Sequence, residues 1–158
     1  MDYLRRTWAD IDLDCIVHNY RELKSRLTPG CRTMAVVKAD AYGHGDGYVS
    51  RALQREGADW FAVSNINEAI SLRRQEVARP ILILGCTPPE MAHTLAELGI
   101  SQTVYSEEYA GELSRAAVEQ KAVIDCHVKI DTGMSRIGFF AQHGHCLLYT
   151  SDAADELD

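Results

Sequence analysis

Short apolar runs alternate along this chain with stretches in which apolar residues recur every three or four positions. The runs predict buried strands, and the three-to-four spacing predicts helices with one buried face. The predicted strands cover residues 34–38, 60–63, 81–84, 102–105 and 123–130. The predicted helices cover residues 49–57, 65–77 and 87–99, with a fourth that begins after Ser106. Strands recur every 20 to 25 residues with a helix between each pair, a rhythm that indicates βαβ units and a parallel sheet.

The N-terminal segment predicts one further strand and one further helix. Residues 7–13 alternate polar with apolar positions, as in a half-buried strand. From Leu13 to Leu27 the apolar residues are spaced for a helix, which Asp12 can cap and which residues 28–30 end.

Three later helices have recognisable starts. Asn65 is followed three residues later by Glu68, in the manner of a capping box. Thr87 precedes two prolines and an acid, which predicts a cap at Thr87. Ser106 precedes two glutamates, which suit the positive end of a helix dipole.

A βαβ chain of this kind predicts either a doubly wound sheet or a (β/α)₈ barrel. Candidate functional residues follow two different strands, with Lys38 after the first and residues 129–136 after the fifth. This placement favours the barrel, because barrel enzymes collect their active residues at the carboxyl ends of several strands. A barrel needs about 250 residues, so a chain of 158 residues is expected to hold about five of its eight strands.

Composition indicates which partners and which cellular compartment to expect. The formal charge of −7 argues against nucleic acid as a partner, because phosphate contacts need a basic face. Five cysteines without a C-x-x-C pair argue against a disulfide framework and suit a reducing compartment. No apolar run approaches the ~20 residues that cross a bilayer, and residues 1–9 lack the apolar core of a signal peptide. We therefore expect a cytoplasmic protein that does not enter a membrane.

Lys38 is the main candidate for chemistry, and its pattern alone leaves two interpretations open. A lysine after Val-Val at a strand end can simply reach solvent. It can also be a nucleophilic lysine that forms a Schiff base.

Three motifs bear on that choice. The run around Lys38 is MAVVKADAYGHG (residues 34–45), preceded by RTWADIDLD (residues 6–14) and followed by KIDTGMSRIG (residues 129–138). Together they resemble the motifs of the alanine racemases, in the same order, and residues 34–45 resemble that family's pyridoxal phosphate attachment site. The resemblance covers the chain from about Arg6 to about Phe140.

The resemblance implies a fold. It implies a (β/α)₈ barrel of which residues 6–140 form the N-terminal part, truncated to about the first five strands, with an N-terminal strand and helix. The family's C-terminal β-domain is expected to be absent from this chain. Residues 146–158 end in an acidic stub and do not continue the family pattern, so we expect them to be a non-native tail.

The resemblance also implies site residues. Lys38 matches the lysine that binds pyridoxal 5'-phosphate and serves as the base on one face of the substrate. Tyr42 matches a tyrosine that helps hold the cofactor phosphate. Arg136 matches an arginine that lies beside the cofactor ring oxygen and the substrate carboxylate. Lys129 matches a lysine that is carbamylated in some members, although a plain lysine paired with Asp131 is an alternative. The second base of the family is a tyrosine from the partner subunit.

The function implied is interconversion of L-alanine and D-alanine for peptidoglycan synthesis, by a homodimer in the full-length protein. On its own, this chain is expected to be inactive or severely impaired. The alternatives are a serine or broad-specificity racemase, a barrel-type decarboxylase and a non-catalytic pyridoxal phosphate-binding barrel. The last two lack the motif runs found here. No metal site is expected, because His143 and His145 have no third ligand nearby in the sequence.

Overall fold

A computed structural model describes residues 7–141 of the chain, and the predicted tail (residues 146–158), His143 and His145 lie outside the described residues. Its centre is a five-stranded, fully parallel sheet with strand order β1-β2-β3-β4-β5. The strands are β1 (Met34–Val36), β2 (Trp60–Val63), β3 (Ile81–Ile83), β4 (Ile100–Val104) and β5 (Cys126–Val128). The five strands predicted from apolar runs are confirmed, with ends shifted by a few residues.

Strand order decides between the two predicted architectures. Each strand pairs with the next one in sequence, so the order is never reversed. A doubly wound sheet reverses its order at a switch point, whereas a barrel adds strands one after another. The sheet is therefore of the barrel type, as predicted, with one open edge at β1 and the other at β5 among the described residues.

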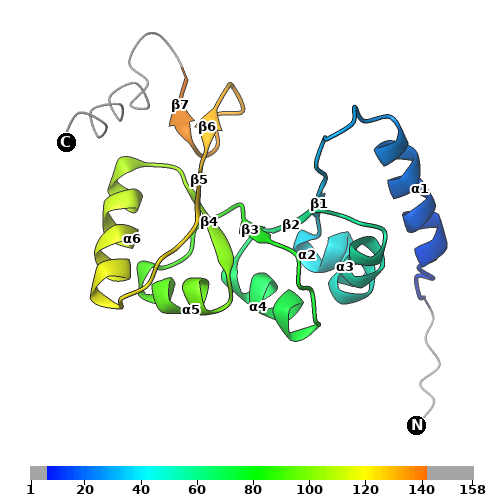
Figure 1. Ribbon diagram of the computed structural model, residues 1–158, viewed down its shortest axis with the longest axis horizontal. Coiled ribbons are helices and arrows are strands. Elements are labelled where there is room, and N and C mark those ends of the chain that lie inside the picture. Colours follow the sequence, from blue (N-terminus) through cyan, green and yellow to red (C-terminus); the bar gives the residue numbers. More distant parts are fainter. Residues whose placement is uncertain (1–6, 142–158) are drawn as a thin grey trace.

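Helices connect the strands and lie in an arc along one side of the sheet (Figure 1). They are α3 (Asp46–Arg55), α4 (Ile66–Arg74), α5 (Ala92–Glu97), which follows the 3₁₀ turn η1 (Pro89–Met91), and α6 (Glu107–Glu119). Side chains on alternate strand positions face these helices and form the hydrophobic core with them. Its fully buried members include Phe61, Val63, Ile81, Ile83, Leu72 and Leu95.

The opposite face of the sheet is covered to different extents along its width. Trp60 of β2 and His127 of β5 meet edge to face, with ring centroids 5.2 Å apart. On the central strands, Ala62 and Leu82 are buried on this face. At the β1 edge, Met34 and Val36 keep about two fifths of their surface exposed. The inner face is therefore closed at its centre and open along β1.

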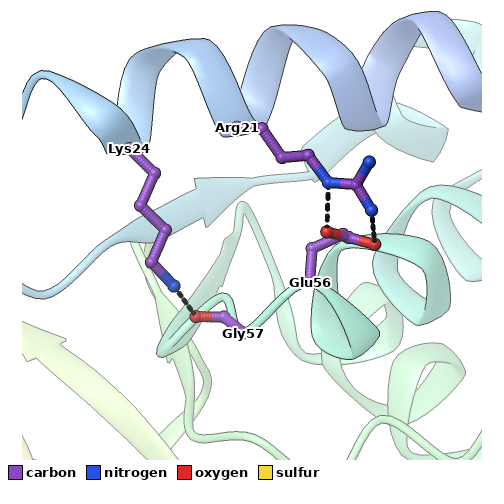
Figure 2. Close-up of polar contacts among 4 residues, drawn as sticks. All are labelled: Arg21, Lys24, Glu56 and Gly57. Atoms are coloured by element: carbon purple, nitrogen blue, oxygen red, sulfur yellow. Dashed lines mark hydrogen bonds and ion pairs between the residues drawn. The ribbon is translucent and has the colours of Figure 1, made fainter.

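Helix α1 (Leu13–Ser25) packs its partly buried Leu13, Ile16 and Tyr20 against the core and is also attached by polar contacts (Figure 2). The Arg21 guanidinium donates two hydrogen bonds to the Glu56 carboxylate, at 2.6 and 2.7 Å, and lowers the pKa of Glu56. Lys24 Nζ donates to the carbonyl of Gly57 at 2.8 Å. No residue of α1 is fully buried, and an apolar cavity of about 520 Å³ lies between α1 and β1.

Two local predictions are wrong. Residues 7–12 form no strand, because a strand needs a neighbour to pair its backbone groups and no described segment pairs with them. Thr87 does not cap a helix: η1 begins after Pro88, without a side-chain cap. Thr87 is instead fully buried, and its carbonyl accepts a hydrogen bond from the Tyr109 hydroxyl.

The remaining helix starts are as predicted. Asp12 accepts hydrogen bonds from the amides of residues 14 and 15 and caps α1. Asn65 caps α4 and Ser106 caps α6, each accepting from the amide three residues on.

Within the described part of the chain, no helix has the length and apolarity needed to cross a bilayer.

Candidate active site

The segment after β1 takes an unusual path. Lys38 opens α2 (Lys38–Gly43), in which the four residues after Lys38 have φ between 51° and 56° and ψ between 38° and 52°. These are left-handed helical values, which cost an L-residue other than glycine roughly 1–2 kcal/mol each. Gly43 and Gly45, which end this segment, also have positive φ. The left-handed turn directly after Lys38 was not foreseen.

Side-chain and backbone hydrogen bonds hold this turn against its strain. Val37 donates to the carbonyl of Ala62, which continues the sheet pairing beyond β1. Asp40 Oδ1 accepts from the amide of Asp46 at 2.8 Å and so joins the turn to the start of α3. These contacts fix the backbone on both sides of Lys38.

A second loop follows β5 and carries Arg136. It contains the short parallel strands β6 (Ile130–Asp131) and β7 (Phe139–Phe140), which Figure 1 shows beyond the end of β5. Asp131 Oδ1 accepts from the amides of Gly133 and Ser135 at 2.9 and 3.0 Å, and these bonds lower the pKa of Asp131. The Asp131 carboxylate is thus hydrogen-bonded to the loop amides.

The two loops meet at one pocket of about 350 Å³ at the carboxyl ends of the strands. Its lining residues are Lys38, Ser64, Leu84, Gly85, Lys129, Arg136 and Ile137. Three of the four predicted site residues therefore share a pocket, although they come from opposite edges of the sheet. Lys38 and Lys129 are half-buried, whereas Arg136 is exposed.

Tyr42 is the predicted site residue that does not line the pocket. Its side chain is 61% exposed, and Lys38 Nζ lies 6.0 Å from the centre of its ring. The left-handed turn thus places the Tyr42 ring next to the lysine but outside the pocket wall.

Sequence reasoning missed the residues that come from β2 and β3. Ser64 and Gly85 each follow the carboxyl end of a central strand, which is the signal that could have identified them. The carbonyl of Gly85 accepts from the buried Gln102 side chain at 2.7 Å. A Cβ atom on Gly85 would lie 2.5 Å from the carbonyl oxygen of Ser64, so only glycine fits here without a shift.

Replacing Gly85 by alanine is expected to lower the free energy of unfolding by about 1–3 kcal/mol, because backbone must move to admit the new methyl group. Gly111→Ala is the matched control. Gly111 lies inside α6 with only ordinary contacts around it, so alanine there is expected to stabilise the chain by roughly 0.5–1 kcal/mol. Urea unfolding of both variants measures the difference. Two variants of equal stability would contradict the close approach of Gly85 to Ser64.

Glu68 was also missed as a site residue. One oxygen of its carboxylate accepts from the amide of Ala39, inside the left-handed turn, and the other accepts from Ser64. Burial raises the pKa of Glu68, but the hydrogen bonds from Ser64 and Ala39 outweigh it, so the pKa is lowered overall. The group is therefore an ionised acceptor at neutral pH.

Two tyrosines pack beside the loop after β3. Tyr105 and Tyr109 stack with ring centroids 4.7 Å apart, and the Tyr105 hydroxyl donates to Cys86 Sγ at 3.0 Å. Burial raises the pKa of Tyr109 to about 12 and, together with the Cys86 contact, raises the pKa of Tyr105 as well. Both phenols therefore keep their protons at neutral pH.

Among residues 7–141, no group of three His, Cys, Asp or Glu side chains could hold a metal ion.

Known proteins with similar sequences and structures show which family this chain belongs to. The family model described as "Alanine racemase, N-terminal domain" matches residues 11–157. The chain belongs to the alanine racemase family. An alanine racemase from Clostridium tetani is 47% identical over 137 residues, which are 87% of this chain and 35% of that protein. The chain thus spans about a third of the length of the curated relatives that it matches.

Solved structures in the family have the same arrangement. An alanine racemase from Clostridium difficile 630 superposes with a TM-score of 0.86 at 36% identity, over 99% of this chain and 41% of that one. A histidine racemase from Leuconostoc mesenteroides subsp. sake superposes with a TM-score of 0.79 at 27% identity, over 92% of this chain and 38% of that one. The fold of residues 7–141 is therefore that of the N-terminal part of the family's barrel.

Proposed function

We propose that this chain is the cofactor-binding part of an amino-acid racemase that interconverts L-alanine and D-alanine. The observation that carries the proposal is the single pocket in which Lys38, Lys129 and Arg136 meet. The relatives named as alanine racemases support alanine as the substrate.

The pocket suits an anionic aromatic cofactor, and we propose pyridoxal 5'-phosphate. Three cationic side chains and the Ser64 hydroxyl line a space of about 350 Å³, within the range of small-molecule sites. Lys38 would hold the cofactor covalently, and the Tyr42 hydroxyl would bind its phosphate. When bound, the cofactor withdraws electrons from the substrate and so makes the α-proton removable.

The side chains then have separate tasks. Arg136 presents a planar, permanently charged fork that suits the substrate carboxylate and orients it. Asp131 holds the loop directly before Arg136 through the amides of Gly133 and Ser135. Lys38 removes or returns the α-proton on one face of the substrate. Carbamylation of Lys129 would place a negative charge in the pocket that also contains Arg136, which would orient the guanidinium.

A serine or broad-specificity amino-acid racemase is the second candidate. The structural similarity to a histidine racemase supports it, because that neighbour acts on a different amino acid with the same fold. We further propose that the full-length protein is a cytoplasmic homodimer whose product D-alanine is used in peptidoglycan.

The test is covalent attachment of pyridoxal phosphate to Lys38 in the 158-residue chain. The lysine amine displaces the aldehyde oxygen as water, and borohydride reduces the resulting C=N bond to a stable link that peptide mass spectrometry locates. We expect most of the label on Lys38, and its loss in Lys38→Ala. Lys121, an exposed lysine far along the chain, is the control: Lys121→Ala is expected to keep the label. Equal labelling of Lys38→Ala and the unmodified chain would refute the assignment.

A further inference from the structure

The Glu68 carboxylate makes hydrogen bonds that its position in the sequence does not predict. Three residues after the N-cap Asn65, a glutamate is expected to bond back to the cap residue of its own helix. The cap itself is present, since Asn65 Oδ1 accepts from the Glu68 amide at 3.1 Å. The Glu68 carboxylate, however, also accepts hydrogen bonds from Ser64, which precedes the cap, and from the turn that carries Lys38.

Both carboxylate oxygens of Glu68 have partners outside α4. Oε1 accepts from the amide of Ala39, the residue directly after Lys38, at 2.9 Å. Oε2 accepts from the amide and the hydroxyl of Ser64 at 2.7 and 2.8 Å. The carboxylate therefore joins the turn after β1 to the end of β2.

The turn after β1 and the end of β2, which Glu68 joins, both contribute side chains to the pocket. Ser64 lines the pocket with Lys38, and its carbonyl packs against Gly85, a third lining residue. The Glu68 side chain thus joins the ends of β1 and β2 at the pocket, and the end of β3 packs against the same Ser64.

The turn needs such support. Its four consecutive left-handed residues, Ala39 to Tyr42, are each unfavourable for a residue that has a Cβ atom, so the conformation persists only when contacts from elsewhere impose it. The Ala39 amide is at the first of these residues, so its hydrogen bond acts at the point where the chain leaves Lys38. A bond to a charged acceptor is among the strongest available for this purpose.

We propose that Glu68 is the positioning residue of Lys38: its carboxylate fixes the left-handed turn through the Ala39 amide and thereby holds the Lys38 amine in the pocket. The functional meaning of this role rests on the proposed function. The hydrogen bond itself does not, so the two are tested separately.

The first test measures the Ala39 amide without any cofactor. Amide hydrogen exchange of the 158-residue chain is followed residue by residue by NMR. We expect protection at Ala39 to fall by about tenfold or more in Glu68→Ala, as for the loss of a bond to a charged group. Glu108→Gln is the control, because Glu108 is also an acid in the first turn of a helix but is exposed. Unchanged exchange at Ala39 in Glu68→Ala would overturn the proposal.

The second test asks whether the effect reaches Lys38. Pyridoxal phosphate and borohydride label the chain, and the ratio of label on Lys38 to label on Lys121 is measured. We expect this ratio to fall about tenfold in Glu68→Ala. In Glu68→Gln it is expected to fall by a smaller factor, because an amide keeps one acceptor oxygen where the carboxylate uses two. Global unfolding would also abolish the preference for Lys38, so the circular dichroism spectrum of each variant is compared with that of the unmodified chain.

The outcomes separate the two proposals. If the unmodified chain carries no label at Lys38, the proposed function fails, while the exchange experiment still decides whether Glu68 holds the turn. If Lys38 is labelled equally in the unmodified chain and in Glu68→Ala, the proposed function stands and the positioning role of Glu68 is refuted.

Discussion

Residues 1–158 alone are expected to racemise alanine at least about 10²-fold more slowly than a complete racemase, because each acid–base group contributes ~10²–10⁴-fold. Racemisation needs one group to remove the α-proton and another to return it on the opposite face. Lys38 provides one of them. The proposed tasks of Lys129 and Arg136, the other ionisable groups of the pocket, are to orient groups and not to carry protons. The phenols of Tyr105 and Tyr109 keep their protons because burial raises their pKa values.

The measurement separates proton exchange from inversion. The chain is incubated in heavy water with pyridoxal phosphate and each alanine enantiomer, and deuterium uptake and chirality are followed together. Exchange of one enantiomer with retention is the expected residual activity. The complete enzyme from Clostridium tetani serves as the positive control, and Lys38→Ala as the negative control. Serine and histidine in the same assay distinguish an alanine racemase from a broader one.

Rapid inversion by residues 1–158 that disappears in Lys38→Ala would contradict this expectation. It would mean that the second base is within this chain. Tyr42, with its ring centre 6.0 Å from Lys38 Nζ, would be the first residue to replace.

Replacing Arg73 by alanine is expected to have the largest effect on stability. Arg73 is at the end of α4, and its guanidinium donates to four backbone carbonyls at 2.6 to 2.9 Å, those of Val77, Arg79, Leu98 and Gly99. It thus ties the loop before β3 to the loop before β4. Hydrogen bonds to charged groups contribute about 1.5–3 kcal/mol each when buried, and part of this set is exposed. We therefore expect a loss of about 2–4 kcal/mol in the free energy of unfolding.

The neighbouring Arg74 provides the control. It is exposed, in the same helical turn, so Arg74→Ala removes the same charge and the same helix propensity without removing the four carbonyl contacts. Thermal unfolding followed by circular dichroism is expected to show a midpoint lower by roughly 5–15 °C for Arg73→Ala and a change of a few degrees at most for Arg74→Ala. Similar midpoints for the two variants would show that the carbonyl contacts contribute little.

Elements with a strong local signal could be predicted from the sequence. Buried parallel strands are short runs of apolar residues because both of their faces are covered, and the runs at 60–63 and 81–84 are β2 and β3 to within one residue. Asp12, Asn65 and Ser106 were recognised as helix caps because a cap satisfies amides only two or three residues away. The 20-to-25-residue repeat predicted parallel βαβ units because the strands and helix of each unit follow one another directly in the sequence.

Predictions failed where a local pattern needed a distant partner. Residues 7–12 alternate as a strand does, yet they are not in a strand, because alternation describes faces and does not supply a neighbour to pair with. The proline-rich start after Thr87 looks like a capped helix, but Thr87 is buried under Tyr109, a contact with a residue 22 positions away. In both cases the tertiary environment, which local patterns do not contain, decided the outcome.

The sequence by itself determined the strands, most helices, their parallel arrangement and, through its three motifs, which residues to examine. Only the tertiary structure decided that Lys38 meets Lys129 and Arg136 across the sheet, that Tyr42 is outside their pocket, and that Gly85 must be a glycine. It also revealed the left-handed turn and the Glu68 carboxylate that supports it. The physical reason is one of range: strand and helix preferences act over a few residues, whereas the site is built from the ends of strands that only the folded sheet brings together.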